Sequence, residues 1–106
     1  MSKALTSFTF GKNIPTASNP GAVVVAGVAS VTILAANENR IFATIVNDSA
    51  NIVYLFFGTP AVVNQGIRLN AAGGSLVCGL GTDIPYTGII TGIATGAGSN
   101  VSVTEG

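Results

Sequence analysis

The sequence predicts an all-β protein: a single β-sandwich or jelly-roll-like domain with an extended N-terminal arm. From residue 21 onward, β-branched residues dominate and glycines interrupt them at short intervals, which is typical of many short strands. No segment keeps a 3.6-residue apolar period with capping residues, so we expect little or no helix. A chain of 106 residues is long enough for one core. We therefore divide it into an arm at 1–20 and a sandwich domain at 21–106.

The first segment, 1–20, differs in composition from the rest. Pro15 and Pro20 favour extended backbone in and before themselves. Phe8 and Phe10 are two residues apart, so both rings lie on one side of an extended strand. A frayed terminus is the alternative interpretation. We expect instead an arm that docks on a partner through its apolar residues, which are Leu5, Phe8, Phe10 and Ile14.

Strands are expected along the remainder at 22–26, 28–35, 40–47, 51–58, 66–70, 74–79, 86–95 and 99–105. The joints between them carry turn-forming residues, such as Asn47-Asp48-Ser49 and Gly58-Thr59-Pro60. The apolar run 21–36 is about sixteen residues long, short of the about twenty that a membrane-spanning helix needs, and no Lys/Arg cluster flanks it. We interpret it as strand. Strands at this spacing favour a sandwich, jelly roll or Greek-key barrel.

Two central segments, 41–46 and 52–57, are apolar on both alternating faces. A two-layer sandwich hides only one face of each sheet, so the second apolar face needs its own cover. The simplest cover is another copy of the chain, or an arm folded back over the sheet. We therefore expect a homo-oligomer whose interface includes Phe42, Tyr54 and Phe57.

The composition excludes several classes of partner and chemistry. Charged residues are 8% and the net charge is zero, against about 25% charged residues in ordinary soluble domains. Four basic residues make no stripe for phosphates or anionic lipid, so we expect neither nucleic-acid nor membrane binding. The chain has no histidine, and its carboxylates are not paired in sequence. We therefore expect no enzyme activity, no metal and no cofactor. Cys78 is alone, so no intrachain disulfide forms.

An ordered series of motifs covers residues 37–106 and resembles a group of small proteins. The series runs through Asn39-Arg40-Ile41-Phe42, Asn47-Asp48-Ser49, Tyr54-Leu55-Phe56-Phe57-Gly58 and the closing Val101-Ser102-Val103-Thr104-Glu105. It is similar to structural proteins of tailed-bacteriophage virions, which include head-decoration (cement) proteins and parts of fibres. The matching positions look like turns and core, so the resemblance transfers no site residue.

The resemblance implies a capsid decoration protein that binds and stabilises the major capsid protein. Such a chain would form a homotrimer at a local three-fold axis on the capsid surface of the virion, assembled in the cytoplasm of the bacterial host. The alternative is a fibre, tail-tip or adhesin module that binds a host surface ligand through its loops. That function favours exposed aromatic side chains in loops, for which Tyr86 is the candidate.

Overall fold

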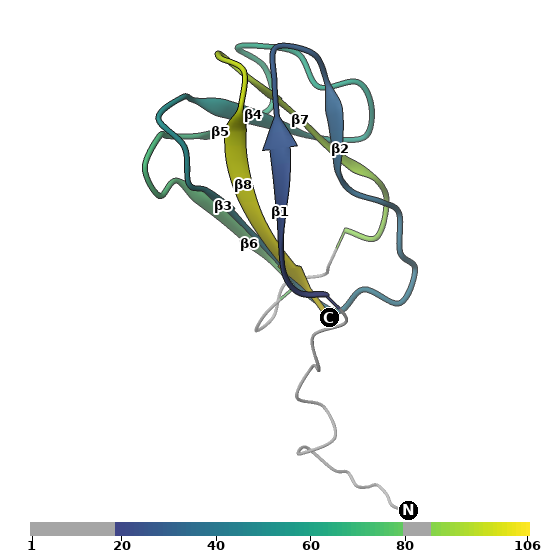
Figure 1. Cartoon of the computed structure of the whole chain (residues 1–106). Helices are drawn as coiled ribbons and strands as arrows, with labels where there is room; N and C mark the ends of the chain where they lie inside the picture. The colour runs from purple at the N-terminus through teal and green to yellow at the C-terminus, as the bar shows by residue number, and fades with distance from the viewer. Residues whose placement is uncertain (1–18, 80–85) are drawn as a thin grey trace, which may run out of the picture.

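The computed structural model describes residues 19–79 and 86–106, and within these ranges the chain is an all-β sandwich (Figure 1). Eight strands form two four-stranded antiparallel sheets that share one apolar core. The predicted fold class is therefore confirmed. The predicted N-terminal arm lies outside the described residues, except where β1 begins. No helix in the described ranges is long and apolar enough to cross a membrane.

The first sheet has the order β1-β8-β3-β6, and the second has the order β2-β7-β4-β5. Their bounds are β1 Asn19–Ala26, β2 Val31–Leu34, β3 Ala43–Asn47, β4 Val53–Phe57, β5 Ile67–Leu69, β6 Ser75–Cys78, β7 Ile90–Ala94 and β8 Ser99–Glu105. Strands β2 to β8 all lie inside the predicted ranges. Only β1 differs, since it begins at Asn19, inside the segment predicted as arm.

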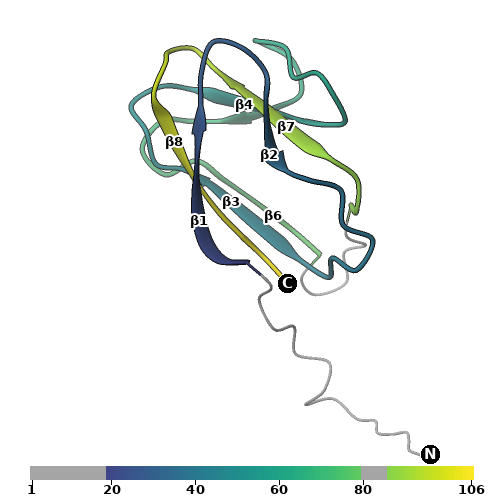
Figure 2. The same cartoon turned by 45° about the vertical axis from the view of Figure 1, so that its right-hand side comes forward.

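Alternation of side chains explains which residues form the core between the sheets. In β8, Val101 and Val103 are buried while Ser102 between them is not, as the sequence pattern predicted. Across the sandwich, Val53 and Leu55 of β4 are fully buried. Burying each of these side chains contributes about 1.5–3 kcal/mol. This alternation orients the opposite set of side chains away from the core, onto the outer faces of the two sheets. Figure 2 shows the two sheets as the layers of the sandwich.

Candidate interaction surfaces

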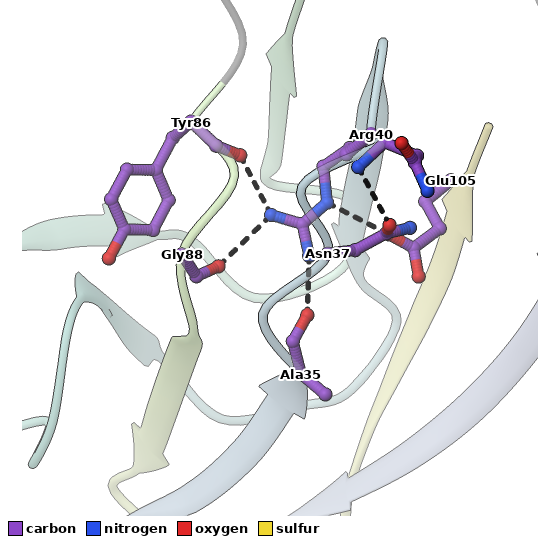
Figure 3. Close-up of polar contacts among 7 residues, drawn as sticks. Ala35, Asn37, Arg40, Tyr86, Gly88 and Glu105 are labelled. Carbon is purple, nitrogen blue, oxygen red and sulfur yellow. Dashed lines mark hydrogen bonds and ion pairs between the residues drawn. The ribbon is translucent and has the colours of Figure 1, made fainter.

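A buried arginine cluster occupies the end of the sandwich where the C-terminus lies beside the start of β1 (Figures 1 and 3). Arg40 is 2% exposed, and its Nε donates a hydrogen bond to Glu105 Oε2 at 2.8 Å. Its Nη1 donates to the carbonyl oxygens of Tyr86 and Gly88, and its Nη2 donates to the carbonyl oxygen of Ala35. The guanidinium therefore joins the end of β8 to the segments that follow β2 and precede β7.

This arginine cluster serves the fold rather than a ligand. The fork of the guanidinium is directed at carbonyl oxygens and a carboxylate of the chain itself, which use its donors. The side chain of Arg40 is completely buried and that of Glu105 is 14% exposed. A buried cation with this set of partners is held in place.

A second buried polar cluster lies at the other end of β3, around Asn47. Its Nδ2 lies 2.7 Å from the Asn51 carbonyl oxygen and 3.1 Å from those of Leu69 and Asn70. Its Oδ1 accepts hydrogen bonds from the backbone N–H and the hydroxyl of Ser49. Carbonyls only accept and a backbone N–H only donates, so these partners fix the orientation of the amide. Asn47 is therefore used by the fold, as the predicted turn at this position requires.

The outer face of the second sheet is covered in part by the chain's own β4–β5 loop, residues 58–66. Tyr54 and Ile93 point outward from β4 and β7, and they pack with Ala61 of this loop into a small second cluster. Tyr54 is 7% exposed, and its hydroxyl donates to Asn64 Oδ1 at 3.0 Å. The second apolar face that the sequence predicted therefore exists on β4. The β4–β5 loop supplies part of the cover for it.

Beside this loop lies a surface cleft of about 280 Å³. It is lined by Phe56, Thr59, Pro60, Val62, Gln65 and Gly66. Phe56 is 41% exposed and Val62 is 45% exposed. None of the lining side chains is charged. The cleft is thus a small, neutral and mainly apolar site.

The outer face of the first sheet has no such cover among the described residues. We call it the open face, and its residues are Val23, Val25, Thr44, Val46, Ser75, Val77, Asn100, Ser102 and Thr104. Val23, Val25 and Val77 are 64%, 57% and 50% exposed. The four strands of this sheet contain one charged residue, Glu105, which is paired with Arg40. The open face therefore combines exposed valines with hydroxyl and amide groups only.

The three residues predicted to form an oligomer interface occupy three different environments. Tyr54 lies under the β4–β5 loop. Phe57 packs against the main core, and its ring stacks on that of Tyr86 with centroids 4.5 Å apart. Phe42 is half-buried just before β3, where its backbone pairs with Gly106. The structure does not bring the three together on one open surface. The arm residues Leu5, Phe8, Phe10 and Ile14 lie outside the described residues.

Sequence reasoning missed both the arginine cluster and the open face. Arg40 was part of a strand-opening motif, and nothing in its spacing indicated a partner at Glu105. The run Val23-Val24-Val25 is strand as expected, but Val23 and Val25 are exposed because they lie on the outer face of an edge strand. That position depends on the strand order. The only signal in the sequence was the low charge of the whole chain.

No protein-family model, curated protein or solved structure matches this chain. In the described residues, no group of three or more His, Cys, Asp and Glu side chains is placed to hold a metal ion.

Proposed function

We propose that the protein is a non-catalytic structural subunit of a tailed-bacteriophage particle, a decoration protein that binds the major capsid protein as a homo-oligomer. The observation that carries the proposal is the uncharged open face with its exposed valines. A protein that works as a free monomer normally keeps a charged, patch-free surface. A subunit that is covered by other proteins in its working state has no such need.

The position of the predicted arm supports the same function. Residues 1–18 precede β1, which is an edge strand of the first sheet. Extended chain spans at most about 3.3–3.6 Å per residue, so a segment of this length can reach well beyond one sandwich. Binding through a short segment is weak for one copy. Copies that are linked in an oligomer gain affinity because the second contact forms at a high effective concentration.

Co-sedimentation with bare capsids of the phage that encodes the chain tests the proposal. The full chain is expected to sediment with the capsids, and a variant lacking residues 1–18 is expected to stay in the supernatant while remaining folded. Replacing Phe8 and Phe10 by Ser should weaken binding strongly, because both apolar anchors are lost. Thr9→Ala is the matched control and should bind like the full chain. Failure of the full chain to bind capsids would contradict the proposed function, whereas retained binding without residues 1–18 would contradict the arm alone.

The cleft beside Phe56 favours the alternative, a fibre, tail-tip or adhesin module. That function calls for an exposed aromatic side chain near loops. Tyr86, the residue expected for this role, is half-buried and stacked on Phe57, whereas Phe56 is exposed. An aromatic ring beside Thr59 and Gln65 suits a neutral ligand with both apolar and hydroxyl groups, such as a sugar. Binding of the isolated chain to host cells, lost on Phe56→Ala, would favour this function over capsid decoration.

A further inference from the structure

We propose that the free edge of β1 pairs with an extended strand of the partner protein, which adds to the first sheet beside β1. The pairing rests on the proposed function, which supplies the capsid protein as the partner, and it adds the surface and the backbone chemistry of the contact. β1 is one of the two edge strands of the first sheet (Figure 1). No strand among the described residues pairs with its outer side.

The hydrogen bonds between β8 and β3 show which residues of β8 direct their backbone groups towards β1. The Asp48 N–H donates to the Asn100 carbonyl oxygen, and the Gly106 N–H donates to the Phe42 carbonyl oxygen. In an antiparallel ladder, alternate residues direct their N–H and C=O groups to opposite neighbours. Even-numbered residues of β8 therefore bond to β3, and odd-numbered residues of β8 bond to β1.

The register of β1 against β8 then identifies the free backbone groups. Val24 lies opposite Val101, an odd-numbered residue, so Val24 bonds to β8. Its neighbours Val23 and Val25 direct their N–H and C=O groups to the opposite side, which is the free edge. Each residue carries one donor and one acceptor. Two donors and two acceptors are thus without a backbone partner among the described residues, and an extended strand offers their partners at the matching spacing.

β1 is the least protected edge strand of the described sandwich. Natural sheets protect their edges with short strands, charged residues, prolines or bulges. The edge strands β2 and β6 have four residues each, and β5 has three, one of which is Arg68. β1 has eight residues and no charge. Pro20 and the register shift before Ala22 affect only its start, so residues 22–26 pair with β8 in an unbroken register.

The side chains beside the free edge determine which kind of strand fits. On the core side, Ala22 and Val24 of β1 and Val31 of β2 are only partly buried, so the core is not fully closed here. An added strand would cover them with the side chains at alternate positions. A charged side chain buried there would find no counter-charge, which is strongly unfavourable. The strand that fits therefore has apolar residues at every second position.

The position of β1 in the chain favours the capsid protein over a second copy as the source of this strand. Residues 1–18, the segment proposed to contact the capsid, lead directly into β1. A protein that is bound by this segment is therefore held beside the free edge. Strand addition is then effectively intramolecular, so a contact of small area reaches high occupancy.

Hydrogen exchange of the full chain, free and bound to bare capsids, tests the pairing directly. In the free chain, the amides of Val23 and Val25 should exchange fast, whereas that of Val24 should exchange slowly because it is paired with β8. On capsids, we expect the amides of Val23 and Val25 to exchange at least about ten-fold more slowly. Exchange during binding, followed by quenching, release and residue-resolved nuclear magnetic resonance, gives this readout.

Val77 on β6 is the matched control, because its N–H faces the other free edge of the same sheet. Even-numbered residues of β3 bond to β8, so its odd-numbered residues bond to β6. Ile45 lies opposite Leu76, which places the N–H of Val77 on the outer side of β6. Its exchange should stay equally fast in the free and the bound chain.

Proline variants test the same pairing through affinity. Val25→Pro removes one outward N–H and places the ring on the pairing side, while the bonds to β8 come from the neighbouring residues and remain. It should raise the dissociation constant for capsids at least about ten-fold, and Val23→Pro should act alike. Val25→Thr keeps the N–H and should bind like the full chain, as should Val77→Pro. Circular dichroism and urea midpoints check that each variant is folded.

Each alternative has its own result. Capsid binding with unprotected amides at Val23 and Val25, or equal weakening by Val25→Pro and Val77→Pro, would overturn the pairing alone. Slow exchange of both amides in the free chain would also overturn it. That protection would identify a second copy if it increased with protein concentration, and residues 1–18 if their removal abolished it. Failure of the full chain to sediment with capsids would contradict the proposed function and this contact together.

Discussion

Arg40 is a buried cation in a chain with few charges, and its partners explain why it is there. The carbonyl oxygens of Ala35, Tyr86 and Gly88 all accept hydrogen bonds from the guanidinium. A buried carbonyl without a partner is costly, so one planar side chain with five donors stabilises several groups together.

Replacing Arg40 by Met should therefore destabilise the fold by about 3–5 kcal/mol, because the Glu105 carboxylate loses its ion pair and three carbonyl oxygens lose a donor. Arg40→Lys should also destabilise it, since an ammonium group lacks the planar fork that reaches these acceptors. Arg68→Met is the matched control. Arg68 is exposed and donates only to Asn70 Oδ1 among the contacts found, so its loss should change stability by less than about 0.5 kcal/mol. The midpoint of urea unfolding measures the stability of all three variants. Equal midpoints for Arg40→Met and Arg68→Met would show that the arginine cluster does not stabilise the fold.

The sequence could not have revealed this cluster. Arg40 and Glu105 are 65 residues apart, and no periodic pattern links positions at that separation. The turn at Asn47 was different, because Asn, Asp and Ser in succession predict a side-chain-capped turn from local chemistry alone. Local hydrogen bonds could be predicted, whereas the burial of Asn47 against Leu69 and Asn70 depends on how the two sheets pack.

The β4–β5 loop shows the same contrast between local patterns, which the sequence reveals, and long-range packing, which it does not. Alternation in the segment that became β4 correctly predicted two apolar faces. The sequence could not show what covers the outer one, because Ala61 and Val63 are ordinary apolar residues in a segment with turn-forming neighbours. Their contact with Tyr54 and Ile93 arises from the way the loop folds back across the sheet. The open face of the first sheet was harder still to predict, since it depends on the order of the strands in the sheet.

Gly66 is the point where this loop returns to the sheet, and its replacement tests how tightly the loop is held. Its φ is +85°, and a Cβ atom there would overlap the backbone oxygen of Leu55. Gly98 is a matched control, with a φ of +71° and no heavy atom near the added Cβ. Gly98→Ala should cost about 1 kcal/mol for the left-handed backbone alone. Gly66→Ala should cost at least about 2 kcal/mol more, because β4 and the loop must move apart.

The urea midpoints of the two glycine variants give this comparison directly. Binding of a hydrophobic dye gives a second readout, because displacement of the loop exposes Tyr54 and Ile93. We expect increased dye binding for Gly66→Ala and none for Gly98→Ala. Identical behaviour of the two variants would show that the approach of Gly66 to Leu55 does not hold the loop in place.

At the scale of the whole molecule, β3 connects the two buried polar clusters. Arg40 precedes it and contacts the segments next to β2 and β7, and Asn47 ends it and contacts Leu69 of β5. The apolar core between the sheets is thus bounded at both ends by hydrogen bonds that cross from one sheet to the other. The fold class and the approximate strand positions followed from composition and turn chemistry. The order of the strands and the packing of the two sheets could not be predicted in this way, because they depend on contacts between residues far apart in sequence.

The arrangement of β1 predicts where the N-terminal boundary of the folding unit lies. Removing residues 1–18 should leave the urea midpoint and the m-value unchanged, because the described core begins with β1. Removing residues 1–26 should abolish cooperative unfolding. β1 pairs with β8 from Asn19 to Ala26 and places the fully buried Ala26 in the core, so its loss leaves β8 as an unprotected edge and opens the core to water.

Tyrosine fluorescence and circular dichroism during urea unfolding compare the two deletions with the full chain. A lower midpoint after removal of residues 1–18 would show that this segment stabilises the sandwich, and cooperative unfolding without residues 1–26 would show that β1 is dispensable for the fold.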